Sequence, residues 1–356
     1  MSMILERPNV ANPVPTLPAS LYRDPAQFER ERQAIFTKEW LLYGRSDQLA
    51  KPGDYLALTI VGYPVVVVRQ KDGTLKGFHN VCRHRAAALA QNPEGAFSGG
   101  MIRCPYHSWT YELNGCLNRS PGFGAEKGAI DPAQWSLFPI SADEWRGLVF
   151  VRIATAGPTL VEWLGPIVPM AAQYPLQDQR FFMEKNQEVA IDWKVYGENY
   201  LECYHCPNMH PGLCESLDIS KYTIDSYPED GFFHLYGPKR DGGFTDGLYF
   251  YRFPFLMLNF YQWGSSIATV EPLGAGRLRH INWYLFSDLS PEKAEENRRS
   301  AEWSAQIVAE DMDMNVTVQR NLEIGVYDRG ILSPKQERAV GAFQNMVRAA
   351  MPGLEG

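Results

Sequence analysis

Two groups of cysteine, histidine and carboxylate residues in this 356-residue chain have spacings suited to metal binding. The first group consists of two pairs separated by nineteen residues, and each pair joins one cysteine to one histidine: Cys82 and His84, then Cys104 and His107. Zinc fingers place a cysteine pair before a histidine pair. In a [2Fe–2S] cluster with two thiolates on one iron and two imidazoles on the other, each loop can instead supply one ligand to each iron. The mixed pairs therefore favour such a cluster, with zinc as the second interpretation.

The second group lies in the C-terminal half, where His205 and His210 are five residues apart. That spacing does not put two side chains on one face of a straight helix. Pro207, however, is expected to end the helix, so that the chain can turn and bring His210 beside His205. Two histidines and one carboxylate form the facial triad of non-haem Fe(II) proteins, which leaves positions open for dioxygen. The pair therefore predicts a mononuclear iron site that takes its carboxylate from elsewhere in the chain.

A long helix expected from about Pro291 to Leu322 supplies this carboxylate. Its apolar residues form a stripe at helical spacing: Ile307, Val308, Met314, Val318 and Leu322. Asp311 falls within the stripe, and because a buried, unpaired carboxylate is costly, it should face a cation. The polar side of the helix carries Asp313 together with Gln306, Glu310 and Arg320. We therefore predict Asp311 as the third iron ligand, with Asp313, interpreted as a solvated charge, as the alternative.

Any one of these histidines or cysteines alone could be an ordinary core residue, and only their combined pattern favours ligation. The remaining cysteines match no cluster spacing and are expected to be buried thiols: Cys116, Cys203, Cys206 and Cys214. Six cysteines in a chain of this size are better explained by ligation or burial than by a disulfide framework.

The expected secondary structure places the two sites in separate domains. Short strands bounded by glycine turns predict a small antiparallel barrel or sandwich around the first site, at 55–60, 64–69, 75–78 and 147–152. A helix at 24–40 precedes them, and a stretch at 154–165 with Pro and Gly follows. Further strands are expected at 181–191, 232–236, 248–261, 265–271 and 278–287, with a helical segment at 195–206.

This mixture predicts an α+β fold with three parts. Residues 1–42 form a helical segment, residues 43–155 an all-β [2Fe–2S] domain, and residues 160–356 a catalytic domain in which helices cover an antiparallel β-sheet.

The composition of the chain restricts the kinds of partner that it can bind. The chain is 45% hydrophobic and 21% charged, as in an ordinary globular protein, and its net charge of −7 leaves no basic stripe for nucleic acid or an anionic membrane. The first twenty residues have no apolar core of the kind a secretory signal needs, and no run of eighteen apolar residues occurs. We therefore expect a cytoplasmic protein with a small-molecule substrate.

Over nearly its whole length the chain resembles the α subunits of Rieske non-haem iron ring-hydroxylating oxygenases. Asn80-Val-Cys-Arg-His-Arg85 and Cys104-Pro-Tyr-His-Ser-Trp-Thr-Tyr111 resemble the two loops that hold the Rieske cluster. Four short matches resemble the iron-binding segment: Trp193-Lys, Glu198-Asn-Tyr200, Glu202-x-x-His205 and His210-Pro211. Glu310-Asp311 with Val318-Gln319 resembles the segment that provides the carboxylate ligand.

The resemblance implies a homotrimer in which the cluster of one subunit reduces the iron of its neighbour. An acidic residue bridges the two sites, and matched by position the bridge runs from His107 to Glu202 and on to His205. Asn199, inside the iron-segment motif, is included with Glu202 among the catalytic residues. Ala86 stands where many members have glycine. Glu202 stands where aspartate is common, and with the following Cys-Tyr-His-Cys-Pro it most resembles the branch acting on quaternary ammonium compounds such as glycine betaine, stachydrine, choline and carnitine.

The implied reaction is reductive activation of O₂ at Fe(II), with one oxygen inserted into a C–H bond; on an N-methyl group the carbinol would release formaldehyde. The chain has no flavin, nicotinamide or plant-type ferredoxin motif, so electrons from NAD(P)H should arrive through a separate flavin and iron–sulfur reductase. Aromatic residues crowd 232–263, where they could bind a quaternary ammonium by cation–π attraction or simply fill a sheet. The alternatives are a ring-hydroxylating or O-demethylating enzyme for an aromatic acid, and a non-catalytic electron-transfer or zinc protein.

Overall fold

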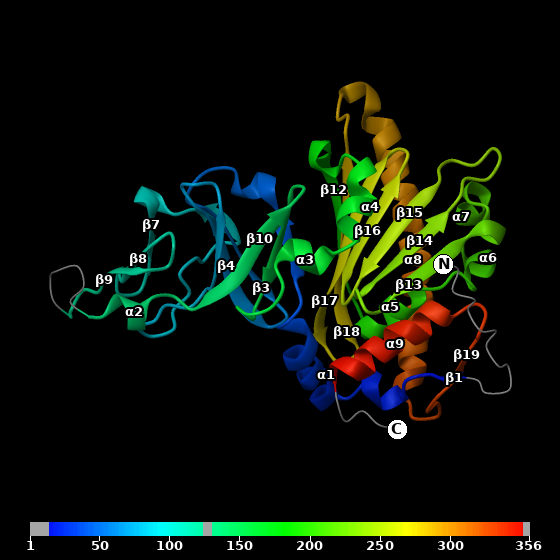
Figure 1. The fold of residues 1–356 in the computed structure, drawn as a ribbon, viewed down its shortest axis with the longest axis horizontal. Coiled ribbons are helices and arrows are strands. Elements are labelled where there is room, and N and C mark those ends of the chain that lie inside the picture. The colour runs from blue at the N-terminus through cyan, green and yellow to red at the C-terminus, as the bar shows by residue number, and fades with distance from the viewer. Residues whose placement is uncertain (1–13, 124–129, 352–356) are drawn as a thin grey trace, which may run out of the picture. The chain divides into compact units, whose positions relative to one another are not determined.

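The computed structural model describes residues 14–123 and 130–351 (Figure 1). The described chain forms two compact units, one made of Ile35–Val168 and the other of residues 14–34 together with 169–351. Residues 14–34 therefore belong by their contacts to the C-terminal unit, whereas the sequence suggested a separate N-terminal segment. The other expected domain limits, 43–155 and 160–356, stay predictions. None of the helices in the described ranges is both long enough and apolar enough to span a bilayer.

The unit Ile35–Val168 is all β apart from short helices. A seven-stranded antiparallel sheet has the order β2 (Leu41–Arg45), β11 (Leu148–Arg152), β10 (Pro139–Trp145), β5 (Leu75–His79), β4 (Tyr63–Arg69), β3 (Asp54–Ile60) and β6 (Glu94–Ala96). A second sheet consists of β7 (Met101–Arg103), β8 (Thr110–Glu112) and β9 (Leu117–Arg119). The run Val65 to Val68 is fully buried, as a strand in the centre of a core requires. The strands β2 and β10 were not expected from the sequence.

The C-terminal unit is built on a second seven-stranded antiparallel sheet. Its order is β12 (Arg180–Val189), β18 (Arg277–Phe286), β17 (Gly264–Gly274), β16 (Leu256–Tyr261), β15 (Gly247–Arg252), β14 (Phe232–Gly237) and β13 (Thr223–Tyr227). Strands β13 to β18 follow one another as a meander, and β12 pairs with the last of them. Three helices pack with each other or with this sheet: α5 (Trp193–Tyr200), α8 (Ala294–Glu323) and α9 (Arg338–Ala350). The predicted α+β fold, a β domain followed by a helix-covered antiparallel sheet, is confirmed.

A buried ionic cluster explains why the N-terminal segment joins this unit. Glu31, at the end of α1 (Pro25–Glu31), accepts hydrogen bonds from the Trp193 indole at 2.8 Å and from the Lys194 ammonium at 2.7 Å. Lys194 also pairs with Asp192 at 2.7 Å, and the side chains of all three charged residues are at most 1% exposed. Removing one partner from such a cluster leaves an uncompensated buried charge, which costs about 3–5 kcal/mol. The N-terminal segment is thereby fixed to the first turn of α5.

Two expectations about helices need correction. The helix expected at 24–40 ends as an α-helix at Glu31 and continues only as a π-turn over Arg32–Phe36. The apolar stripe assigned to the C-terminal helix is only partly buried, since Met314 and Val318 are 46% and 40% exposed. The buried face of α8 is instead largely polar: Asn297, Ser300, Ala301, Ser304, Met312, Asn315, Gln319 and Leu322.

Candidate metal centres

Two loops with the same backbone geometry carry the cysteine–histidine pairs. In the loop after β5, Cys82 N donates to Ala87 O and Ala86 N donates to Cys82 O at 3.0 Å. In the loop between β7 and β8, Cys104 N donates to Trp109 O and Ser108 N donates to Cys104 O at 3.1 Å. Ala86 and Ser108 both have a φ of 59°, a left-handed conformation that residues with a Cβ atom adopt at a cost. In each loop, these backbone hydrogen bonds thus close a turn that contains the histidine.

The side chains of the two loops fit a [2Fe–2S] cluster. The rings of His84 and His107 lie 4.6 Å apart, and the two cysteines are each 2% exposed. Burial raises the pKa of the Cys82 thiol, while the Tyr111 hydroxyl, 3.4 Å from its sulfur, opposes that rise. Nδ1 of His84 is buried and has no hydrogen-bond partner among the described residues. Because an orphaned buried nitrogen is costly, this atom is suited to be a metal ligand.

Three short helical segments build the second site. Helix α5 is capped by the side chain of Asp192, which accepts from Lys194 N, and ends at Tyr200. His205 lies immediately before α6 (Cys206–Met209), and His210 lies between α6 and α7 (Pro211–Ser216). Pro207 was expected to end a helix that contained His205. It lies instead in the first turn of α6, where proline needs no backbone donor.

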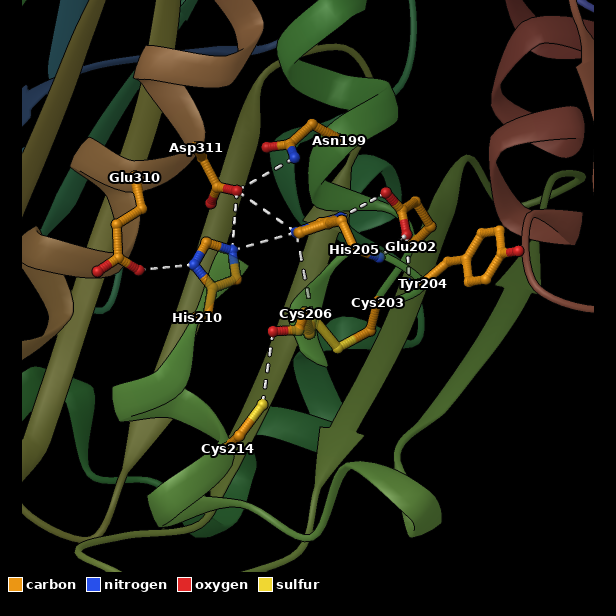
Figure 2. Close-up of a disulfide and its surroundings, with 10 residues drawn as sticks. All are labelled: Asn199, Glu202, Cys203, Tyr204, His205, Cys206, His210, Cys214, Glu310 and Asp311. Atoms are coloured by element: carbon orange, nitrogen blue, oxygen red, sulfur yellow. Dashed lines mark hydrogen bonds and ion pairs between the residues drawn. A yellow bond between two sulfur atoms is a disulfide. The ribbon is translucent and has the colours of Figure 1, made fainter. Parts of the chain in front are cut away.

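His205, His210 and Asp311 converge on one point (Figure 2). His205 Nε2 lies 3.1 Å from His210 Nε2 and 3.4 Å from Asp311 Oδ1, and His210 Nε2 lies 3.0 Å from the same oxygen. Ligand atoms at right angles and about 2.1 Å from a metal ion are about 3 Å apart, so these separations fit one face of a coordination octahedron. Asp313 is exposed on α8 and lies outside this group.

The electrostatics of the triad favour a cation. Burial opposes a positive charge on His205, yet the hydrogen bonds that it donates to Asp311 and Glu202 raise its pKa to about 9. Burial likewise opposes ionisation of Asp311, and its contacts with the two histidines nevertheless hold its pKa below the ordinary value. The carboxylates that raise the pKa of His205 also attract a metal ion.

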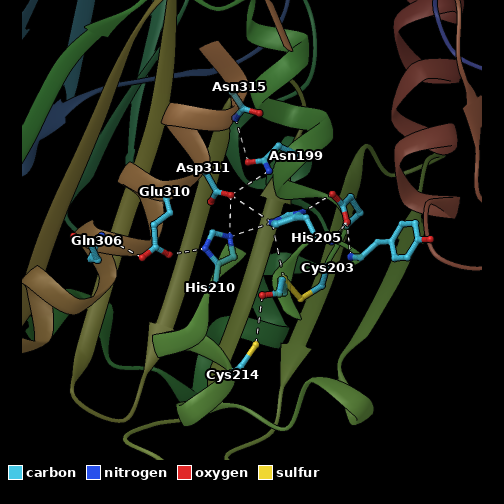
Figure 3. A network of polar contacts seen from close by, with 12 residues as sticks. Asn199, Cys203, His205, His210, Cys214, Gln306, Glu310, Asp311 and Asn315 are labelled. Carbon is cyan, nitrogen blue, oxygen red and sulfur yellow. Dashed lines mark hydrogen bonds and ion pairs between the residues drawn. A yellow bond between two sulfur atoms is a disulfide. The ribbon is translucent and has the colours of Figure 1, made fainter. Parts of the chain in front are cut away.

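Each histidine has a carboxylate behind it. Glu202 accepts from Nδ1 of His205 and from the backbone N of His205 at 3.2 Å. Glu310 Oε2 accepts from Nδ1 of His210 at 2.8 Å, and Gln306 donates to the other oxygen of Glu310 at 3.1 Å (Figure 3). Such partners fix the tautomer that presents Nε2 to a metal. The helical pattern predicts Glu310 on the solvated side of the helix, and the structure differs. Its position next to Asp311, together with the need of each histidine for a second partner, is the signal in the sequence.

Asn199 and Asn315 orient the carboxylate of Asp311. Asn199 Nδ2 donates to Asp311 Oδ1 at 3.1 Å, and Asn315 Nδ2 donates to Asn199 Oδ1 at 3.3 Å (Figure 3). Asn199 therefore contacts a candidate ligand directly. Asn315, on the polar buried face of α8, was missed because an amide inside an amphipathic pattern carries no distinctive signal.

The cysteines outside the first site differ from expectation. Cys203 and Cys206 form a disulfide beside His205, where buried free thiols were expected (Figure 2). Cys116 is exposed rather than buried. Cys214, partly buried, donates to the carbonyl of Cys206 at 3.4 Å. The short Cys-x-x-Cys turn brings the first pair together locally, which a count of cysteines does not reveal.

A cavity of about 100 Å³ lies beside the triad and is lined by residues of α5, α8 and the sheet. Five of its lining residues are tyrosines: Tyr196, Tyr200, Tyr222, Tyr249 and Tyr261. Only Tyr249 and Tyr261 come from the aromatic stretch at 232–263, most of whose phenylalanines are buried in the core. Tyr196, Tyr200 and Tyr222 were not singled out from the sequence.

A β domain suited to a [2Fe–2S] cluster, followed by a helix-covered sheet with a two-histidine, one-carboxylate site, defines an iron oxygenase of the Rieske class. The family model of the Rieske [2Fe-2S] domain matches residues 39–130. The model of the ring hydroxylating alpha subunit (catalytic domain) matches residues 176–247 and 236–353. The chain belongs to this family of ring-hydroxylating oxygenase α subunits.

Relatives and solved structures agree with this assignment. The carnitine monooxygenase oxygenase subunit of Acinetobacter pittii (strain PHEA-2) is 30% identical over 93% of this chain and 94% of its own length. The choline monooxygenase of Arabidopsis thaliana is 28% identical over 88% of this chain and 78% of its own. A quaternary ammonium Rieske monooxygenase in complex with L-carnitine superposes with a TM-score of 0.82 at 26% identity, covering 98% and 99% of the two chains. The protein is thus an oxidoreductase with a Rieske cluster and a mononuclear iron, and it receives electrons from a separate reductase.

Proposed function

We propose that this protein hydroxylates or oxidatively N-demethylates a small quaternary ammonium compound at an iron held by His205, His210 and Asp311. Cys82, His84, Cys104 and His107 hold the Rieske cluster. The observation that carries the proposal is the convergence of the three iron ligands, within 4.8 Å of one another, on the wall of a tyrosine-lined cavity.

The cavity supports the choice of substrate class. Aromatic faces attract a quaternary ammonium by cation–π interaction, by about 2 kcal/mol or more where the cation is desolvated. The charged residues that line the cavity include the carboxylates Glu202 and Asp311, which also favour a cation. The relatives named for carnitine, glycine betaine and choline oxidation are consistent with this choice.

When bound, the ferrous ion supplies reductive activation of O₂, so that one oxygen atom enters a C–H bond beside the substrate nitrogen and the other leaves as water. The residues of the chain have separate tasks. Glu202 and Glu310 hold the rings of His205 and His210, and Asn199 orients Asp311. The buried tyrosines exclude bulk water from the cavity. An N-methyl carbinol formed in this way breaks its C–N bond and releases formaldehyde.

Electrons reach this site across a subunit interface in our proposal. The protein assembles as a homotrimer in the cytoplasm, and a flavin and iron–sulfur reductase transfers electrons from NAD(P)H to the cluster. Glu202 then links His107 of one subunit to His205 of the next. In support, Glu202 lies in the loop that connects the cavity to the surface, next to Tyr204, which is 58% exposed.

The test is product analysis with the purified oxygenase, a compatible reductase, NAD(P)H and O₂. We expect red-brown protein with one mononuclear iron beside the cluster, and oxidation of choline, carnitine or glycine betaine with matching O₂ consumption. Formaldehyde release distinguishes N-demethylation from hydroxylation elsewhere. Oxidation of an aromatic acid, with no turnover of any quaternary ammonium compound, would contradict the proposed substrate class. A colourless zinc protein would contradict the proposal altogether.

A further inference from the structure

Two asparagines on neighbouring parts of the sheet line the iron cavity, and they differ in their hydrogen bonding. Asn259, on β16, is fully engaged. Its Oδ1 accepts from the Tyr200 hydroxyl at 2.5 Å, and its Nδ2 donates to Ser266 Oγ at 2.9 Å. Both polar atoms of its side chain therefore already have a partner within the protein.

Asn282, on β18, is only half engaged. Its Nδ2 donates to the Tyr284 hydroxyl at 3.1 Å, while its Oδ1 is buried and has no hydrogen-bond partner among the described residues. The residue is 1% exposed, so the cost of this orphaned acceptor is not relieved at the protein surface. Leaving a buried acceptor unsatisfied costs about 1–3 kcal/mol. A ligand in the cavity that brought an O–H or N–H donor to Asn282 would recover that free energy.

The charges around the cavity disfavour a second possibility, that its far end receives a carboxylate. No lysine or arginine occurs among the described residues that line it. Burial raises the pKa of Tyr200, Tyr249 and Tyr261, so their hydroxyls stay neutral. His280, on the same face of β18 as Asn282, is neutral as well, because burial lowers its pKa to about 4.

The metal does not reverse this balance. Glu202, Glu310 and Asp311 contribute three carboxylates around the triad, which outweigh the two positive charges of an Fe(II) ion. A substrate carboxylate in the cavity would therefore be desolvated without a cationic side chain of the protein to compensate it, which is costly. A cation with an uncharged, hydrogen-bond-donating end meets neither difficulty.

We propose that Asn282 determines specificity by accepting a hydrogen bond from the far end of the substrate, so that the preferred substrate is a quaternary ammonium compound ending in a hydroxyl or N–H group. The inference rests on the proposed function, because it presumes that a quaternary ammonium compound occupies this cavity. Asn282 discriminates among such cations, whereas the tyrosine faces bind all of them.

The test compares three cations that share the trimethylammonium group: choline, which has a hydroxyl; its O-methyl ether, which cannot donate; and glycine betaine, which has a carboxylate. Dissociation constants are measured by anaerobic calorimetry on the iron-loaded, cluster-containing enzyme. We expect choline to bind about 10- to 100-fold more tightly than the ether, since a lost hydrogen bond to a buried group costs about 1–3 kcal/mol. Glycine betaine should bind more weakly than choline.

Substitutions test whether Asn282 is the residue that causes the preference for choline over its ether. Asn282→Ala should reduce the ratio between choline and the ether to about one, and Asn282→Asp, which keeps the acceptor, should preserve a preference for choline. Asn259→Ala is the matched control: its oxygen already accepts from Tyr200, so both cations should weaken alike and the ratio should persist. The wild-type series remains decisive even where a variant folds poorly.

The outcomes separate this inference from the function on which it rests. If choline and its ether bind equally, or the ether or glycine betaine binds best, quaternary ammonium binding stands and the role of Asn282 is wrong. Tightest binding of the ether or of glycine betaine would mean that the amide of Asn282 presents Nδ2, not Oδ1, to the cavity. If none of the three cations binds, the proposed substrate class and the inference both fail.

Discussion

Glu310 Oε2 lies 2.8 Å from Nδ1 of His210, on the side of the ring opposite the nitrogen that faces Asp311. Adjacent residues of one helix thus contact the two nitrogens of a single imidazole. Glu310 contacts Nδ1 of the His210 ring and Asp311 contacts Nε2. Helix α8 therefore determines the position of His210 and also supplies the third ligand.

Replacing Glu310 should weaken iron binding without disturbing the cluster. For Glu310→Ala we expect about a 10- to 100-fold loss of Fe(II) affinity, the usual effect of removing a carboxylate behind a metal-bound histidine. Iron content after competition with a chelator measures the loss. Asp313→Ala, an exposed carboxylate three residues further along α8, is the control and should retain iron. Equal losses in both variants would point to a general effect of charge on the helix.

Substituting the ligands of one metal site should leave the metal at the other site in place. Cys82→Ser or Cys104→Ser should remove the visible cluster absorbance and all turnover, whereas His205→Ala, His210→Ala and Asp311→Ala should remove the mononuclear iron and leave the spectrum intact. Absorbance and iron analysis on the same samples check both statements. If Asp313→Ala empties the iron site and Asp311→Ala does not, the wrong carboxylate was assigned.

Glu202→Gln should slow electron transfer while both sites remain filled. Glutamine retains an oxygen that can accept from His205 and from the backbone, so the loop should keep its shape, but the charge is lost. In a single turnover of pre-reduced enzyme with substrate and O₂, cluster oxidation should slow by about 10- to 100-fold. Glu215→Gln, an exposed glutamate on the nearby helix α7, serves as the control. An unchanged rate in Glu202→Gln would leave this residue only the task of orienting His205.

The left-handed conformation of Ala86 should make glycine the more stable residue at this position. Its φ of 59° costs about 1–2 kcal/mol for a residue with a Cβ atom, which exceeds the entropy that glycine loses on folding. Ala86→Gly should therefore raise the free energy of unfolding by about 0.5–1 kcal/mol, followed by loss of cluster absorbance in urea. Ala88→Gly, also exposed but without a positive φ, should lower it by about 0.4–1 kcal/mol. Destabilisation by both variants would show that the turn is unstrained.

A buried carboxyl group on α5 should make stability depend on pH. Burial raises the pKa of Glu198 to about 7, although hydrogen bonds from Tyr22 and Gln344 and the charge of Lys194 oppose the rise and Asp192 adds to it. The folded state thus binds a proton that the unfolded state releases near pH 4.5, so the free energy of unfolding should fall as pH rises from about 4.5 to about 7.

Glu198→Gln should reduce this dependence, to which Asp192 also contributes because burial raises its pKa to about 6. It should stabilise the protein at pH 8, because its amide oxygen can accept from both Tyr22 and Gln344. Urea unfolding of both proteins at pH 5 and pH 8 measures the difference. Glu292→Gln, at an exposed position, should retain the wild-type pH profile. A parallel profile for Glu198→Gln would contradict the raised pKa.

The sequence predicted long and strongly periodic elements well. Helix α8 was expected at 291–322, and the structure has a short turn at Pro291–Lys293 followed by Ala294–Glu323. Strands β17 and β18 were expected within a few residues of their limits. Strand β13 lies at the sheet edge with four of its five residues exposed, and it was missed. The irregular chain between α5 and α7 has no such periodicity and was misread.

Site residues could be predicted where chemistry restricts the choice of side chain, and not where packing does. The cysteine and histidine spacings, and the carboxylate within an apolar stripe, carried enough information to bring His205, His210 and Asp311 forward as a group. Tyr196 and Asn282 carried none, because a tyrosine or asparagine at these positions does not differ from any other until the sheet and helices enclose it. Met314 and Val318 were expected to be buried beside Asp311, and both are exposed.

The separation of the iron ligands along the chain has a consequence for assembly. His210 and Asp311 are 101 residues apart, and strands β13 to β18 all lie between them. A chain that emerges from its N-terminus exposes both histidines well before the third ligand exists. The long-range pairing of β12 with β18, which closes this sheet, is slow compared with the formation of local turns. Iron loading should therefore be one of the last events in maturation, and a nascent or C-terminally truncated chain should acquire its cluster while its catalytic site is still unable to retain metal.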